Sequence, residues 1–142
     1  MGAAEEFAAF SSQFPDSPLK ADAARRSLYS RAEADAARGD FAAAQKTFGL
    51  YLSQFPGSDL ALRASVRRAE ALFRSGEPGA AAALLDQADG AFARALAEGR
   101  PADLLFAGSM VAAQAHLAAG DGVLARASVS AAAPFAVTPA EQ

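Results

Sequence analysis

Apolar and polar residues follow one another along this chain with the three- and four-residue spacing that is typical of amphipathic helices. The clearest stretch, residues 41–54 with the residue after it, places five apolar side chains on one helical face: Phe41, Ala44, Phe48, Tyr51 and Phe55. Glycine–acid pairs and Phe-Pro pairs interrupt the pattern at intervals, and both are signals at which helices stop and start. The pattern therefore predicts a series of helices joined by short turns.

These signals divide the chain into about seven helices. Their expected ranges are residues 3–13, 18–38, 41–54, 60–74, 78–98, 102–119 and a last helix that ends near residue 132. The fifth is long, and Gly90 marks the point at which it could bend or split. Residues 134–142 contain prolines and are expected to form a frayed tail. We therefore expect one domain, residues 1–133, and a C-terminal tail, residues 134–142.

The turns recur at a regular interval. Gly39-Asp40, Gly76-Glu77 and Gly120-Asp121 are 37 and 44 residues apart, and the segment FPGSDL at 55–60 restates FPDSPL at 14–19. Periods of this length indicate helical hairpins that stack, so that each hairpin buries its apolar face on the next.

Composition supports helices throughout. Hydrophobic residues make up 52% of the 142 residues, and most of them are alanine, the strongest helix former, while Val and Ile are scarce. The fold class is therefore predicted to be all-α. The net charge is −3 and no block of one sign occurs, which argues against nucleic acid or an anionic membrane surface as the main partner.

The sequence predicts no membrane-spanning helix and leaves the cellular compartment open. The longest uncharged window, between Asp103 and Asp121, falls short of the roughly 20 apolar residues that a spanning helix needs, and it carries polar side chains. The first ten residues lack the basic flank and apolar segment of a secretory signal. Cysteine is absent, so disulfides give no indication of the redox environment.

The central hairpin resembles a tetratricopeptide repeat (TPR). That pattern falls on Ala32, Gly39-Asp40-Phe41, Ala44, Phe48 and Pro56. Two later units match at their small and glycine positions: Ala69, Gly76, Ala81 and Ala88, then Ala113, Gly120, Ala125 and Ala132. The resemblance covers about residues 3–133, although Asp35 and His116 stand where the family places an aromatic residue. It implies a right-handed superhelix of stacked antiparallel helix pairs.

A narrower signature, F-x-x-F-x-x-x-F-P-x-S, resembles the bacterial periplasmic TPR group, of the Tol–Pal-associated and barrel-assembly lipoprotein type. It occurs twice, at Phe7, Phe10, Phe14, Pro15 and Ser17 and again at Phe48, Tyr51, Phe55, Pro56 and Ser58. This resemblance implies a scaffold in a bacterial envelope assembly. The expected location is periplasmic if the chain is part of an envelope protein, and cytoplasmic otherwise.

The TPR resemblance also implies a concave groove lined by the first helix of each pair. The groove positions fall on Arg26, Tyr29, Glu33, Arg63, Arg67, Glu70, Phe73, Arg74, Met110 and Gln114. Arg63, Arg67, Glu70 and Arg74 share one helical face, which would suit an acidic peptide segment because guanidinium groups bind carboxylates in pairs of hydrogen bonds. The alternative is a solvated face with internal Arg–Glu pairs. Chaperone binding through a Lys–Asn carboxylate clamp is not expected, because the corresponding places hold Tyr29, Glu33, Val66 and Glu70.

No catalytic, metal or cofactor site is predicted. His116 is the single histidine, and helical spacing places no carboxylate beside it, so a packed histidine is the favoured interpretation. The pairs Glu5/Glu6 and Asp86/Asp89 are interpreted as solvated charges rather than an acid–base dyad. P-loop, dinucleotide and zinc-protease motifs do not occur.

These observations predict a non-enzymatic scaffold that binds a peptide or protein segment. One alternative is self-assembly into a homo-oligomer through an apolar edge formed by Phe7, Phe10 and Phe14. A further alternative is the regulatory arm of an enzyme.

Overall fold

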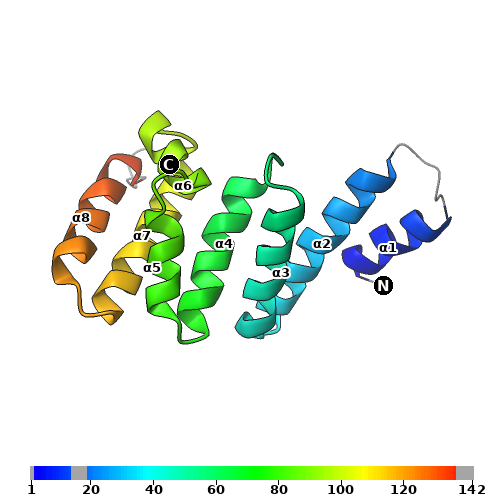
Figure 1. Ribbon diagram of the computed structural model, residues 1–142, viewed down its shortest axis with the longest axis horizontal. Helices are drawn as coiled ribbons and strands as arrows, with labels where there is room; N and C mark the ends of the chain where they lie inside the picture. Colours follow the sequence, from blue (N-terminus) through cyan, green and yellow to red (C-terminus); the bar gives the residue numbers. More distant parts are fainter. Residues whose placement is uncertain (1, 14–18, 137–142) are drawn as a thin grey trace.

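The computed structural model describes residues 2–13 and 19–136, with the side chains of all but residues 7, 10 and 11. These residues form helices and turns and no strand, so the fold is all-α (Figure 1). The helices are α1 (Ala3–Gln13), α2 (Lys20–Ala37), α3 (Phe41–Gln54), α4 (Ala61–Arg74), α5 (Pro78–Asp86), α6 (Ala91–Glu98), α7 (Ala102–Ala118) and α8 (Gly122–Ala132), followed by a 3-10 turn (Ala133–Phe135).

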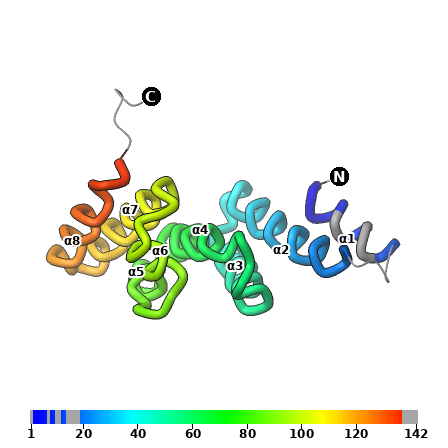
Figure 2. Tube along the Cα trace, turned by 90° about the horizontal axis from the view of Figure 1, so that it is seen from above, coloured from blue at the N-terminus to red at the C-terminus, as the bar shows by residue number. Residues whose placement is uncertain are grey.

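The helices lie side by side in one elongated row, with α1 and α8 at opposite ends (Figure 1). Neighbours in sequence pack together along most of the row, and α4 also packs against α6 and α7. Seen from above, α3 and α5 lie on the same side of α4 (Figure 2). The row is therefore open, and its two ends do not meet.

The predicted glycine turns are confirmed. Gly39, Gly76 and Gly120 have φ values of 79°, 93° and 86°, in the left-handed region that glycine adopts without a steric penalty. In each turn the following acidic residue donates its amide to a carbonyl five residues earlier, such as Asp40 to Asp35 at 3.0 Å. Glu77 and Asp121 repeat this bond with Leu72 and His116. This pattern ends a helix by satisfying carbonyls that have no partner within it.

The turn between α3 and α4 shows what the Phe-Pro-x-Ser signature does structurally. Ser58 Oγ accepts a hydrogen bond from the amide of Leu60 at 3.0 Å and also bonds the hydroxyl of Tyr51. The serine thus ties the turn to a buried residue of the preceding helix. The earlier copy of the signature, which includes Phe14, Pro15 and Ser17, lies outside the described residues.

Two clusters of buried side chains form the core. The first gathers Ala32, Ala44, Phe48, Tyr51, Ala64 and Ala71 from α2, α3 and α4. The second gathers side chains of α4 to α7, including Val66, Leu72, Leu85, Phe92 and Leu105. Because α4 contributes to both clusters, it is the helix on which the two halves of the row depend.

The sequence left open whether the helix expected at 78–98 is continuous or split at Gly90, and the structure shows that the chain forms two helices there. Helix α5 ends at Asp86, Gln87 leaves the helical region with ψ of 114°, and Gly90 is extended with φ of −72° and ψ of 162°. The Gly90 amide closes the intervening turn on the Gln87 carbonyl at 2.9 Å. The split raises the expected seven helices to eight within the described residues. The break covers the turn-forming residues 87–90 rather than Gly90 alone.

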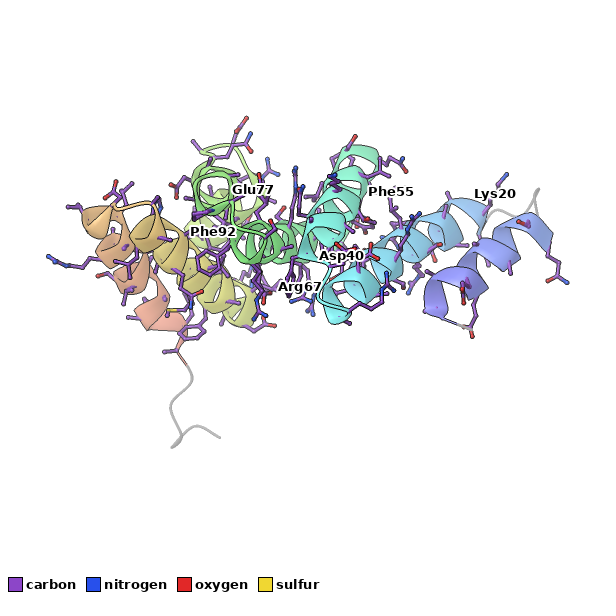
Figure 3. All side chains as sticks on the ribbon, turned by 90° about the horizontal axis from the view of Figure 1, so that it is seen from below. Lys20, Asp40, Phe55, Arg67, Glu77 and Phe92 are labelled. Carbon is purple, nitrogen blue, oxygen red and sulfur yellow. The ribbon has the colours of Figure 1, made fainter. Side chains whose placement is uncertain are left out.

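A close approach of α6 and α7 depends on Gly108. A Cβ placed on Gly108 would lie 2.2 Å from Cε2 of Phe92, so only glycine leaves room for the aromatic ring at this crossing. Figure 3 labels Phe92 at this crossing. The packing of the Phe92 ring against Gly108 therefore helps to hold the short helix α6 on α7.

Leu19 precedes α2, which begins at Lys20, and its side chain is 60% exposed. The expected tail begins within the 3-10 turn, where Phe135 packs against the second core cluster. Within the described parts of the chain, none of the helices has the length and apolarity needed to cross a membrane.

Candidate functional site

A hollow of about 560 Å³ lies between α2 and the start of α4. It is lined by Tyr29, Glu33, Leu60, Arg63 and Arg67. Four of these five residues are among those that the TPR resemblance places in a groove, so the structure brings this part of the expected site together. We refer to it as the α2–α4 hollow.

Arg67 is held in place by two carboxylates. Its Nε and Nη2 donate to Oε1 and Oε2 of Glu33 at 3.0 and 2.9 Å, and its Nη1 donates to Oε2 of Glu70 at 2.6 Å. Hydrogen bonding to Glu33, with the charges of both carboxylates, raises the pKa of Arg67 against the effect of burial. The fork crosses from α4 to α2, and it leaves Arg67 few donors for a partner. The alternative of internal Arg–Glu pairs is therefore confirmed at this residue.

Arg63 lies one turn earlier on α4 and is exposed. It belongs to no ion pair among the described residues, and it lies beside Tyr29 closely enough to influence its titration. Of the two arginines that line the hollow, Arg63 is thus the one whose guanidinium is available to a carboxylate from outside.

Tyr29 forms the floor of the hollow. Its ring packs edge-on against Phe48 and Tyr51, with centroids 5.7 and 5.5 Å apart, which fixes the side chain against the first core cluster. Burial, followed by the charge and hydrogen bonding of Glu33, raises the pKa of its hydroxyl, and the nearby arginines oppose that shift. The hydroxyl therefore stays protonated well beyond neutral pH and can donate a hydrogen bond.

The rest of the arginine face continues along α4 away from the hollow. Arg74 Nη2 lies 3.4 Å from Oε1 of Glu70, and its Cζ stands 5.2 Å from the centroid of the Phe41 ring. Phe73 is half-buried and packs against the second core cluster rather than facing a groove. Glu70 is consequently shared between two arginines, and this part of the face is largely neutralised within the chain.

The remaining expected groove residues do not line the hollow. Arg26 Nε donates to Oδ2 of Asp22 at 2.8 Å on the exposed surface of α2. Met110 is half-buried and Gln114 is exposed, both on α7, which packs against α4 on the far side from α2. The expected ten-residue groove is therefore reduced to a compact site of four residues and Leu60.

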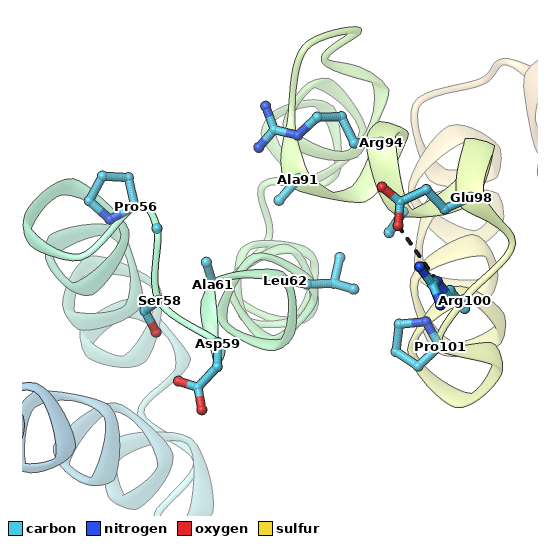
Figure 4. Close-up of a pocket in the computed structure, with 12 residues that line it drawn as sticks. Pro56, Ser58, Asp59, Ala61, Leu62, Ala91, Arg94, Glu98, Arg100 and Pro101 are labelled. Carbon is cyan, nitrogen blue, oxygen red and sulfur yellow. Dashed lines mark ion pairs between the residues drawn. The ribbon is translucent and has the colours of Figure 1, made fainter.

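A second hollow, of about 490 Å³, separates the α3–α4 turn from α6 (Figure 4). Arg94, Glu98 and Arg100 stand on one wall, and Asp59 stands on the other. Glu98 and Arg100 pair at 3.9 Å, and Asp59 pairs with Arg25 of α2. Its charged groups are thus exposed and largely matched with one another, which makes it a weaker candidate than the α2–α4 hollow.

Helical spacing missed a partner of His116. The histidine is buried, as expected, but its Nε2 lies 3.0 Å from Oδ2 of Asp86, which was interpreted as a solvated charge. The two residues are 30 positions apart and on different helices, so no local pattern could join them. Asp86 is the last residue of α5, which packs against the helix α7 that carries His116. Among the described residues no group of three or more histidines and acids gathers to hold a metal ion.

The apolar edge expected for self-assembly falls on side chains that the structure does not describe. The side chains of Phe7 and Phe10, and all of Phe14, lie outside the described part of the chain. The large apolar side chains that the structure shows as exposed include several at the opposite end of the row: Leu117, Val123, Leu124 and Val129.

Comparison of the chain with known protein families, with curated proteins and with solved structures found no match.

Proposed function

We propose that this protein is a non-catalytic scaffold of the TPR type, a superhelix of stacked helix pairs that binds a segment of another protein in the α2–α4 hollow. The segment would carry a carboxylate for Arg63 and a flat or apolar side chain for Tyr29 and Leu60. Recognition of this kind needs complementary shape and charge and no bond-making step.

One observation carries the proposal: the hollow combines a fixed aromatic floor with one available cation. Tyr29 is held by its ring contacts, and the Arg67–Glu33 fork fixes the wall beside it. Because these groups are already ordered, a ligand would lose little free energy in arranging them. Aromatic and arginine side chains are also those on which binding energy at protein interfaces is concentrated.

The repeat supports the TPR assignment within this proposal. The glycine turns share one geometry, and the helices they join stack in an open row, as the resemblance implies. The setting in a bacterial envelope is proposed on the Phe-Pro-x-Ser signature, whose serine ties the α3–α4 turn to Tyr51.

The test is a peptide selection followed by titration. Peptides selected from a random library on the immobilised chain should be enriched in acidic and aromatic residues. Fluorescence anisotropy should then show that Arg63→Glu weakens their binding by at least about tenfold, because the change replaces an attraction with a repulsion.

Arg126→Glu is the matched control. Arg126 is an exposed arginine on α8, so the substitution makes the same change in net charge away from the hollow. The control should leave the affinity within about twofold of the parent chain. Equal losses in the two variants would reduce the effect to overall charge, and unchanged affinity in Arg63→Glu would refute the site.

A further inference from the structure

A small pocket lies where four helices of the C-terminal half meet. Its volume is about 200 Å³, and it is separate from the α2–α4 hollow. The lining residues are Leu85 and Asp86 of α5, Phe92, Ala93 and Leu96 of α6, Ser109 and Ala112 of α7, and Ser128 and Ala131 of α8. The break at residues 87–90 creates the pocket, because it lets α6 turn away from α5 and cross α7.

Ser109 is the first residue that bears on what the pocket can bind. It is 2% exposed, and its Oγ has no hydrogen-bond partner among the described residues. Ser65, a buried serine of α4, bonds back to its own helix instead, because its Oγ donates to the Ala61 carbonyl at 3.0 Å. A buried hydroxyl without a partner is costly, so the site favours a ligand that bonds Ser109 Oγ.

Asp86 gives the pocket its charge. Its carboxylate is about half exposed and is anchored from one side by His116 Nε2, at 3.0 and 3.3 Å from its two oxygens. No lysine or arginine lines the pocket. The remaining lone pairs of Asp86 therefore face a site with no cation of its own, which suits an ammonium group.

The walls between these two polar groups are apolar. Leu85, Phe92 and Ala112 are buried, and the Phe92 ring is fixed by its seat on Gly108. A cavity of about 150 Å³ holds a benzene ring, so this pocket has room for one ring with a short substituent. The pocket thus offers an anionic group, an apolar body and a hydroxyl.

We propose that this pocket binds a small arylalkylamine, with its ammonium at Asp86, its ring between Leu85, Phe92 and Ala112, and a hydroxyl at Ser109. The proposal does not depend on the peptide-binding function. The same chemistry occurs in a free amine and in a polypeptide that begins with an aromatic residue, and the experiment distinguishes the two.

The experiment uses calorimetry and NMR on the full chain. Tyramine is the reference ligand and should bind with a dissociation constant on the order of 1 mM or tighter. Phenethylamine, which lacks the hydroxyl, should bind about two- to tenfold more weakly. The neutral para-ethylphenol should bind at least about tenfold more weakly, and the anionic phenylpropionate should not bind. Equal binding across this series, or no binding of tyramine, would overturn the proposal.

Variants locate the effect. Asp86→Asn should weaken tyramine at least about tenfold, whereas Asp89→Asn, which removes an exposed carboxylate that does not line the pocket, should have no effect. Ser109→Ala should make tyramine and phenethylamine bind equally. If Asp86→Asn fails to fold, the ligand series on the parent chain and cross-relaxation between tyramine and the Phe92 ring still decide the matter.

A final arm separates the two sources of the ligand. A tripeptide amide that begins with tyrosine should bind more tightly than tyramine if the site recognises a chain terminus, and its N-acetylated form should not bind. Weaker binding of the tripeptide amide than of tyramine would assign the site to a free amine.

Discussion

At the scale of single residues, the absence of a side chain can matter as much as its presence. Gly108 lies within α7, where glycine weakens a helix relative to alanine, yet a Cβ there would overlap the Phe92 ring. Gly79, near the start of α5, has no atom within 4 Å of the same position. Packing therefore requires a glycine at position 108, whereas no contact in the structure requires one at position 79.

We therefore predict that Gly108→Ala lowers the free energy of unfolding by about 1–3 kcal/mol, the usual cost of overpacking. Gly79→Ala should leave it unchanged or raise it by up to about 1 kcal/mol, since alanine restricts the unfolded chain. Urea unfolding followed by circular dichroism measures both. A Gly108→Ala variant as stable as Gly79→Ala would show that Phe92 moves without cost.

At the scale of helices, the starts of α3, α5 and α8 can be compared, because each of these helices follows a glycine–acid pair. Asp40 Oδ1 accepts the Ala43 amide at 3.0 Å, and Asp121 Oδ1 accepts the Leu124 amide at 2.9 Å. Glu77 occupies the same place before α5 but makes no such bond, and Pro78 follows it. The repeated glycine–acid pair is thus one turn with two kinds of helix start.

Asp40→Ala should cost about 1 kcal/mol of unfolding free energy, within the range known for helix N-caps. Glu77→Ala should cost much less, because no side-chain bond is lost. Thermal unfolding of the two variants beside the parent chain gives the comparison. Equal losses would mean that the acidic charge, rather than the capping bond, stabilises these turns.

Local patterns predicted most of the helices because their determinants lie within a few residues. Gly39, Gly76 and Gly120 stop helices through their own backbone conformation, so a single sequence shows them. The break at 87–90 was harder to place, because residues on both sides of it are good helix formers and the ring of Phe92 needs a distant glycine. The bounds of the break therefore could not be placed from Gly90 alone.

The candidate site was predictable only in part, for the same reason. Helical spacing correctly placed Arg63 and Arg67 on one face of α4. It could not show that Glu33, 34 residues away, takes up the donors of Arg67. Helical spacing also could not show that Asp86 pairs with His116, or that Ser109 Oγ has no hydrogen-bond partner among the described residues. Each of these features depends on which helices become neighbours.

At the scale of the whole molecule, ion pairs connect α2 with the α4 region. The Arg67–Glu33 fork is one, and Arg25 with Asp59 at 2.6 Å is another. Helix α3 packs against both α2 and α4 and so supplies the apolar connection between them. The spacing of α2 and α4, and with it the width of the α2–α4 hollow, is therefore set partly by charge.

A double-mutant cycle on Arg67 and Glu33, each changed to alanine, should give a coupling free energy of about 1 kcal/mol, because the pair is two-pronged and only about a third exposed. The coupling should shrink in high salt. A parallel cycle on Arg26 and Asp22, an exposed pair within α2, should give a smaller value. Indistinguishable couplings would mean that the fork does not hold the hollow open.

The sharing of α4 between the two core clusters has a mechanical meaning. A force applied to the two ends of the row would be transmitted through α4. Ala64 and Ala71 of this helix belong to the first core cluster, and Val66 and Leu72 belong to the second. Separation of α4 from the cluster on one side would leave the cluster on the other side intact. We therefore expect the row to unfold in two steps under tension, one for each core cluster.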